Sequence, residues 1–110
     1  MGTMSYDGLS VQFDDRVLAH LHIVILQKFR AKQSFVMSWV DGVGAGSGRT
    51  VIWLTPGLPI VFKFAGGRLP AIDRAWLAAL GASADSSTGL IVLNEHGELA
   101  KSTGTNMHTN

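Results

Sequence analysis

The sequence of 110 residues contains no cysteine. Without thiols the chain can form neither disulfide bonds nor thiolate metal sites, and it has no thiolate nucleophile. The absence of disulfide bonds is compatible with a reducing compartment, so we expect a cytoplasmic protein that relies on its core for stability.

Charged side chains are also scarce, because they make up 15% of the sequence against about 25% in an average soluble protein. Nine lysines and arginines oppose eight aspartates and glutamates, which gives a net charge of +1. Dedicated duplex-DNA binders draw much of their affinity from phosphate neutralisation, so this balance argues against that class. The hydrophobic content of 46% instead indicates a folded domain with apolar surface to spare for a partner.

Long apolar runs are absent too, and none approaches the roughly 20 residues of a membrane-spanning helix. The opening residues MGTMSYDG lack the basic and apolar regions of a signal peptide. We therefore expect no association with a membrane.

What is present is a pattern of short extended segments and amphipathic helices, in the order β-β-α-β-β-β-α-β. Asp7-Gly8 is typical of a hairpin turn, and Asp14 is placed to cap the first helix. The expected strands are Thr3–Tyr6, Leu9–Phe13, Ser34–Val40, Thr50–Thr55, Pro59–Phe64 and Leu90–Leu93, and the expected helices cover residues 15–31 and 73–82.

This order predicts an α+β fold with a mainly antiparallel sheet and both helices packed on one face. Pro56-Gly57-Leu58 is expected to form a tight turn between two paired strands. Side chains alternate between the two faces along each expected strand. This alternation places Val51 and Trp53 on the same face as Trp39 and leaves apolar side chains on both faces of the sheet. Two helices can cover only one face, so we expect a homodimer to cover the other.

The expected domain covers residues 1–94. From residue 95 to residue 110 the chain is rich in Gly, Ser, Thr and Asn and has little to bury. We expect this part to be a polar, disordered tail.

Three segments in this order, DDRVLAHLHIVILQKFR, GRTVIWLTPGLPIVFKF and GGRLPAIDRAWLAAL, resemble a family of small uncharacterised actinobacterial proteins. The resemblance covers about residues 1–94. Asp73 stands before Arg-Ala-Trp where the family often has asparagine, and both residues cap helices well. The matching positions are Asp15-Arg16, Leu18-Ala19-His20-Leu21, Gly48-Arg49-Thr50, Trp53, Pro56, Pro59, Arg68, Pro70 and Arg74-Ala75-Trp76-Leu77.

Members of this family often carry the automatic name "ATP-dependent DNA ligase". A ligase needs a nucleophilic lysine in a K-x-D-G-type motif, and the chain's lysines at positions 28, 32, 63 and 101 lack that context. The resemblance therefore implies a shared fold and no particular activity.

Other enzyme motifs fail on spacing or context. The Gly-rich link of residues 42–50 joins two expected strands and has Arg49 where a phosphate-binding loop has lysine, so we interpret it as a hairpin link. His20 and His22 are two apart on a helix and point in different directions, which disfavours a shared metal, and we expect His20 on the polar side. Asp14 and Asp15 are explained by helix capping. We therefore expect no cofactor and no metal site.

The remaining candidates are basic and aromatic residues that could contact a partner. Basic and aromatic side chains on one sheet face could stack and neutralise single-stranded nucleic acid. Parity argues against this for Lys63, which alternates with Phe62 and Phe64 and points away from them. Homodimerisation is therefore our leading interpretation, with a nucleic-acid-binding accessory to DNA repair as the alternative. The candidate contact residues are Trp39, Arg49, Trp53, Lys63, Arg68 and Arg74.

Overall fold

The computed structural model describes residues 1–42 and 48–107, which form a mixed α+β fold. The chain order differs from the expected one only by two additional strands near the C-terminus. The elements are β1 (Gly2–Tyr6), β2 (Leu9–Phe13), α1 (Asp15–Arg30), β3 (Phe35–Asp41), β4 (Arg49–Leu54), β5 (Ile60–Lys63), α2 (Arg74–Ala84), β6 (Leu90–Ile91), β7 (Lys101–Ser102) and β8 (Gly104–Met107).

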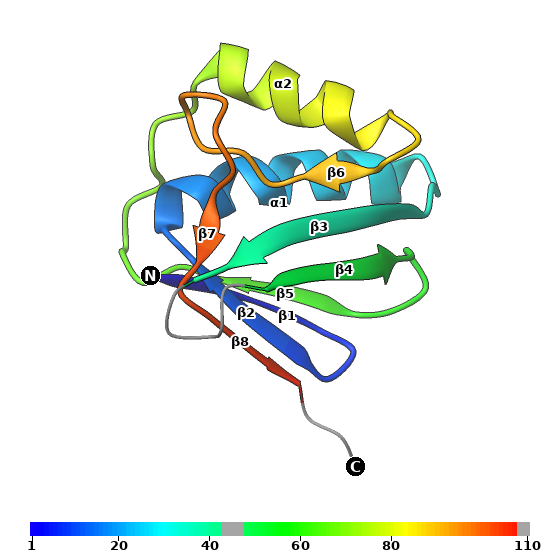
Figure 1. Cartoon of the computed structure of the whole chain (residues 1–110), viewed down its shortest axis with the longest axis horizontal. Helices are drawn as coiled ribbons and strands as arrows, with labels where there is room; N and C mark the ends of the chain where they lie inside the picture. The colour runs from blue at the N-terminus through cyan, green and yellow to red at the C-terminus, as the bar shows by residue number, and fades with distance from the viewer. Residues whose placement is uncertain (43–47, 108–110) are drawn as a thin grey trace.

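The strands divide between two sheets (Figure 1). The first sheet has the order β5-β1-β2-β8, and all its pairs are antiparallel. The second sheet has the order β4-β3-β6, with β7 also pairing with β3. Among the described strands, only the β3–β6 and β3–β7 pairs are parallel. The expectation of a mainly antiparallel α+β fold is confirmed.

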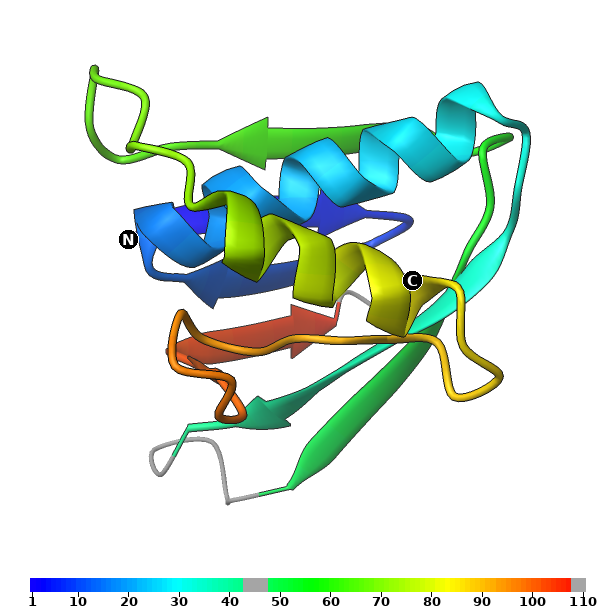
Figure 2. The ribbon, with the colours of Figure 1, turned by 90° about the horizontal axis from the view of Figure 1, so that it is seen from above.

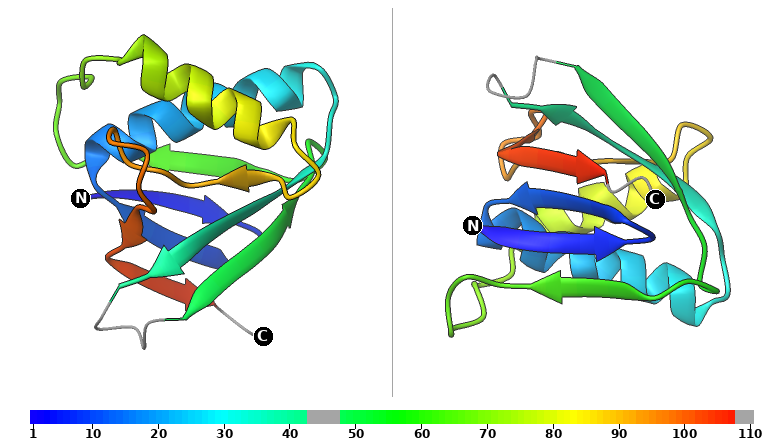
Figure 3. Two further views of the ribbon diagram at one scale, coloured as in Figure 1. Left: turned by 45° about the horizontal axis from the view of Figure 1, so that its top comes forward. Right: turned by 90° about the horizontal axis from the view of Figure 1, so that it is seen from below.

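The expected pairing of β4 with β5 is wrong. Residues 56–58 do turn, with the Leu58 N–H donating to the Thr55 carbonyl at 3.4 Å, but the turn carries the chain from one sheet to the other. β5 pairs with β1 instead (Figure 3). The Tyr6 hydroxyl accepts a hydrogen bond from the Thr55 N–H at 2.9 Å, which fixes the crossing point between the sheets.

Both helices lie on the same side of the first sheet, with α1 between that sheet and α2 (Figures 1 and 2). Asp14 caps α1 by accepting from the Arg16 N–H at 2.8 Å, and Asp73 caps α2 by accepting from the Trp76 N–H at 3.1 Å. Within the described residues, neither helix has the length and apolar character needed to cross a membrane.

The expectation of a disordered tail from residue 95 differs from the structure up to residue 107. β7 pairs with β3, β8 pairs with β2, and the Thr103 N–H donates to the Gln12 carbonyl at 2.8 Å. The composition gave no sign of this, because the segment is held by hydrogen bonds rather than by buried apolar side chains. Residues 108–110 of the expected tail lie outside the described residues.

His20 is a core residue, and its expected place on the polar side of α1 is wrong. Its Nδ1–H donates to the Arg16 carbonyl at 2.7 Å, and its Nε2 accepts from the Asp73 N–H at 2.9 Å. The ring also stacks on Trp76, with the centroids 3.9 Å apart. His20 therefore joins α1 to the start of α2 as a neutral, fully hydrogen-bonded side chain.

Candidate interaction face

The outer face of the first sheet, away from the helices, is largely polar. Along β1 and β2 the buried residues alternate with Thr3, Ser5, Ser10 and Gln12, and these point outward. Because alternate residues of a strand lie on opposite faces, the apolar side chains of β1 and β2 all face the helices. On β5, Val61 is exposed on this face opposite the polar Ser5, and a single exposed apolar side chain is common on protein surfaces.

The outer face of the second sheet is different. Three outward residues of β3 lie directly opposite three of β4 in the antiparallel register. Trp53 is 61% exposed and Val51 is 58% exposed. We call this surface the β3–β4 face, and it consists of the opposed pairs Val36–Trp53, Ser38–Val51 and Val40–Arg49.

The register decides which side chains reach this face. Phe35, Met37 and Trp39 of β3 point inward, where they are opposed by Leu54, Ile52 and Thr50 of β4. Directly opposed residues share a face, so Trp39 and Trp53 lie on opposite sides of the sheet. The expectation that they share a face was wrong, because the sequence does not reveal the register across the Gly-rich link.

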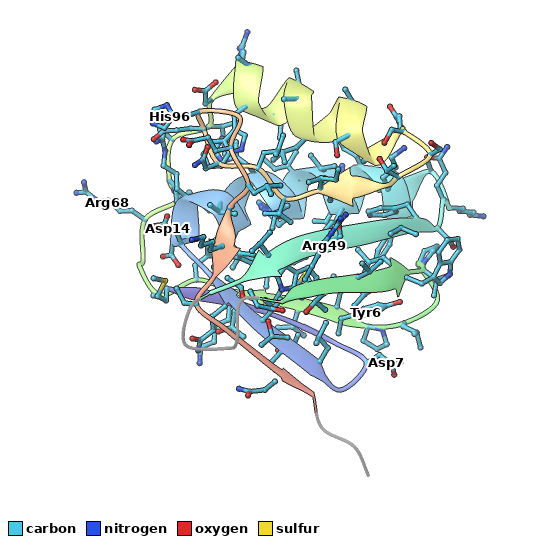
Figure 4. All side chains as sticks on the ribbon, in the orientation of Figure 1. Tyr6, Asp7, Asp14, Arg49, Arg68 and His96 are labelled. Carbon is cyan, nitrogen blue, oxygen red and sulfur yellow. The ribbon has the colours of Figure 1, made fainter. Side chains whose placement is uncertain are left out.

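Arg49 lies flat over β3 at one end of the β3–β4 face (Figure 4). Its Nη2 donates to the Ser38 hydroxyl at 3.0 Å, so part of its hydrogen-bonding capacity is used within the sheet. A small cavity of about 100 Å³ opens beside it, lined partly by Val40, Ile91 and Leu99. A groove of about 540 Å³ lies at the other end, beside Trp53 and Val36.

The structure brings together only two of the sequence-predicted contact residues, Arg49 and Trp53. Trp39 is buried, Lys63 lies on the outer face of the first sheet, and Arg74 is exposed at the start of α2. Arg68 extends from the loop between β5 and α2, well to the side of Arg49 (Figure 4). The six residues therefore do not form one contact surface.

Asp41, which the sequence did not single out, is where the two sheets meet. Its Oδ1 accepts from Thr105 Oγ1 at 2.9 Å, Trp39 Nε1 at 3.2 Å and Ser102 Oγ at 3.4 Å. Its Oδ2 accepts from Thr50 Oγ1 at 2.8 Å. Burial raises the pKa of Asp41, but the hydrogen bonds from these four side chains outweigh burial and lower the pKa overall. Two of the four donors, Ser102 and Thr105, lie more than 60 residues further along the chain, so no local motif marks this position.

The other acidic candidates also serve the fold. Beyond the Asp14 cap, the Asp15 carboxylate accepts from the Gly66 N–H at 2.9 Å and from the Ala65 N–H at 3.1 Å. These backbone hydrogen bonds lower the pKa of Asp15 and hold the loop that follows β5.

A cleft of about 490 Å³ lies between the start of α1 and the turn before β7. The Arg16 guanidinium sits over the Trp76 ring, 5.6 Å from its centroid, and forms an ion pair with Glu95. The Arg16 and Glu95 side chains therefore pair with each other within this cleft. In residues 1–42 and 48–107 no cluster of three or more acidic or histidine side chains could hold a metal ion. Residues 43–47 of the Gly-rich link lie outside the described residues.

Comparison with known proteins finds one family. A domain of unknown function, DUF7882, matches residues 1–95. No curated protein and no solved structure matches the chain. The match ends before β7, so the last two strands lie beyond the part of the chain that the family describes.

Proposed function

The chain belongs to the DUF7882 family of domains of unknown function, and we propose that it acts as a non-enzymatic interaction domain that forms a homodimer through the β3–β4 face. The contrast between the two outer faces supports this proposal. Thr and Ser line the outer face of β1, whereas Val51 and Trp53 are exposed on β4. An apolar group on one uncovered face marks an interaction surface.

A second copy suits this face for three reasons. A two-fold axis brings the same patch of both copies together, so apolar side chains meet apolar side chains. The face carries a single cation, Arg49, already bonded to Ser38, and the net charge of +1 causes little repulsion between copies. Finally, β4 ends its sheet and pairs only with β3 in the described part of the chain, which allows a close approach from its open side.

Trp53 is the expected centre of the interface. Tryptophan is enriched among the few residues that supply most of the binding energy at interfaces, because its large ring buries much apolar area. A stable interface buries about 800 Å² on each partner, so the neighbouring residues Val36, Val51 and Arg49 must take part as well. Ser38 is already buried within the chain and contributes no area. The absence of cysteine remains compatible with a reducing compartment, so the proposal places this dimer in the cytoplasm, without a membrane.

Val51→Thr should weaken the dimer, whereas Val61→Thr should not. Val51 lies on the β3–β4 face and Val61 on the outer face of the first sheet, and they are 58% and 57% exposed. Threonine keeps the shape and the strand preference of valine but adds a hydroxyl group that loses water at the interface. Since the change occurs twice in a symmetric dimer, we expect the dissociation constant to rise about 10- to 30-fold.

Sedimentation equilibrium of both variants and the unmodified chain measures this difference. Val61→Thr controls for the general effect of an added hydroxyl group on an exposed strand. Equal dissociation constants for the two variants would show that the β3–β4 face is not the interface.

The alternative is a nucleic-acid-binding accessory to DNA repair, which would give the ligase name of the resembled family a biochemical basis. One observation favours it: Arg49 and the exposed Trp53 share a face, so a base could stack beside a cation. However, Lys63, Arg68 and Arg74 lie elsewhere. This alternative requires salt-sensitive binding of single-stranded DNA that Arg49→Ala abolishes and Arg74→Ala leaves intact, which fluorescence anisotropy at low salt measures.

A further inference from the structure

The segment of residues 101–107, which we call the C-terminal strap, joins the two sheets with little apolar packing. β7 pairs with β3 through Lys101 and Ser102, and β8 pairs with β2 along its length. Among residues 101–106 only Ser102 is buried, and none of these residues belongs to the hydrophobic core. Segments with few buried apolar contacts open at lower free energy than the core does.

The groups that hold the strap all belong to an earlier part of the chain. Ser102 and Thr105 donate to the Asp41 carboxylate, and the Thr103 N–H donates to the Gln12 carbonyl. The ladder partners of the strap lie on β2 and β3. A second copy of the chain presents the same groups in the same arrangement, so every bond made within one chain can also be made between two chains.

The strand that the strap covers is poorly protected as an edge. Proteins protect exposed edges with lysine, proline or bulges. β2 has the sequence LSVQF, which contains none of these residues, and it pairs regularly with β1. The opposite edge of the same sheet, β5, carries Lys63 and follows Pro59. Once the strap leaves, β2 becomes a regular, unprotected edge that accepts another strand.

Additional chain length is folded into the turn before the strap. The Asn94 N–H donates to the Glu98 carbonyl at 2.7 Å, and Leu93 forms a bridge with Leu99. The Asn94 side chain also accepts from the N–H groups of His96 and Glu98. If this exposed turn straightens, each of its residues adds up to about 3.3–3.6 Å of reach.

We propose that the C-terminal strap exchanges between copies of the chain, with β8 of one copy pairing with β2 of another, and that Asp41 is a latch whose hydrogen bonds must break before the strap can leave. Cutting the hydrogen bonds to Asp41 weakens the attachment of the strap while leaving the β2 edge intact. The exchange centres on the β2 edge of the first sheet, whereas the proposed dimer centres on Trp53 of the second sheet, so the exchange does not require that dimer.

Introduced cysteines test the exchange, because the chain has no cysteine of its own. Ser10 and Asn106 are neighbours across the β2–β8 pair. A chain carrying Ser10→Cys is mixed with one carrying Asn106→Cys at high concentration and oxidised, and the covalent dimers are separated on a non-reducing denaturing gel and identified by mass spectrometry. A disulfide between positions 10 and 106 in this mixture can form only between two chains.

Exchange predicts that the 10–106 dimer exceeds the proportion expected from random pairing, and that Asp41→Asn, which makes opening easier, increases the rate of its formation several-fold. Thr105→Val, which removes one donor to the latch, provides a second variant should Asp41→Asn not fold. A mixture of Ser10→Cys with Lys63→Cys controls for random collision, since Lys63 is exposed and two strands away. Adding Val51→Thr should leave the yield unchanged. Pairing at the random proportion, in the unmodified background and in both latch variants, would overturn the proposal.

Discussion

Replacing His20 with alanine should lower the free energy of unfolding by about 3–4 kcal/mol. The imidazole is fully buried, so its removal leaves a cavity against Trp76, on which it stacks. The change also leaves the N–H of Asp73, the N-cap residue of α2, without its acceptor. Urea denaturation followed by far-ultraviolet circular dichroism measures the loss.

His22→Ala is the matched control. His22 is only partly buried; its ring donates to the Ala19 carbonyl of its own helix and touches Phe62 and Phe64 edge-on, without a hydrogen bond to another element. We expect it to cost no more than about 1 kcal/mol. If the two variants lost equal stability, His20 would not be the link between the helices that its contacts indicate.

Replacing Asp41 with alanine should cost about 2–4 kcal/mol at neutral pH. Four side-chain donors from β3, β4, β7 and β8 would lose a shared charged acceptor, and the buried indole N–H of Trp39 would retain only Thr105. Hydrogen bonds to an ionised group are stronger than neutral ones, which is why this position should be sensitive. Chemical denaturation at pH 7 measures the loss.

The pH dependence of stability distinguishes the effect of the Asp41 charge from the effect of its side-chain shape. Because its folded-state pKa lies below the usual 3.8, the carboxylate stabilises the fold above that value. This contribution disappears as the pH falls through the lowered pKa. Asp41→Asn resembles the protonated side chain, so its stability should lie below that of the unmodified protein at pH 7 and converge with it once the pH is well below the lowered pKa of Asp41. A constant difference down to that pH would contradict the assigned role.

Sequence periodicity predicted all the elements up to β6, with bounds that differ by only a few residues. It succeeded because α1 carries a continuous apolar stripe with Asp14 as its cap, and because β3 and β4 are rich in branched and aromatic residues. Such signals are local, so they can be read without knowing which strands pair.

Local sequence signals do not show which strands pair with each other. The Pro56-Gly57 turn has the composition of a hairpin turn, yet β5 pairs with the edge of β1. The hydrogen bond from the Thr55 N–H to the Tyr6 hydroxyl holds the chain where it crosses to that sheet. The strap was missed for a similar reason. A segment held by backbone ladders and a shared carboxylate carries no hydrophobic pattern.

The candidate site was predicted in part. Arg49 and Trp53 were singled out and do share an exposed face, whereas Trp39 is buried because the β3–β4 register opposes it to Thr50. The sequence indicated apolar residues on both faces of a single sheet. The structure places two exposed apolar side chains, Val51 and Trp53, together on the second sheet, whereas the first sheet exposes Val61. The expected interface is therefore smaller and more specific.

The molar mass of the unmodified chain in solution tests the central claim most directly. Size-exclusion chromatography with multi-angle light scattering at micromolar concentration should give twice the 11.8 kDa of one chain. Trp53→Thr should return the mass to that of one chain while leaving the circular dichroism spectrum unchanged. A mass of 11.8 kDa for the unmodified protein at every concentration would show that the β3–β4 face binds no second copy.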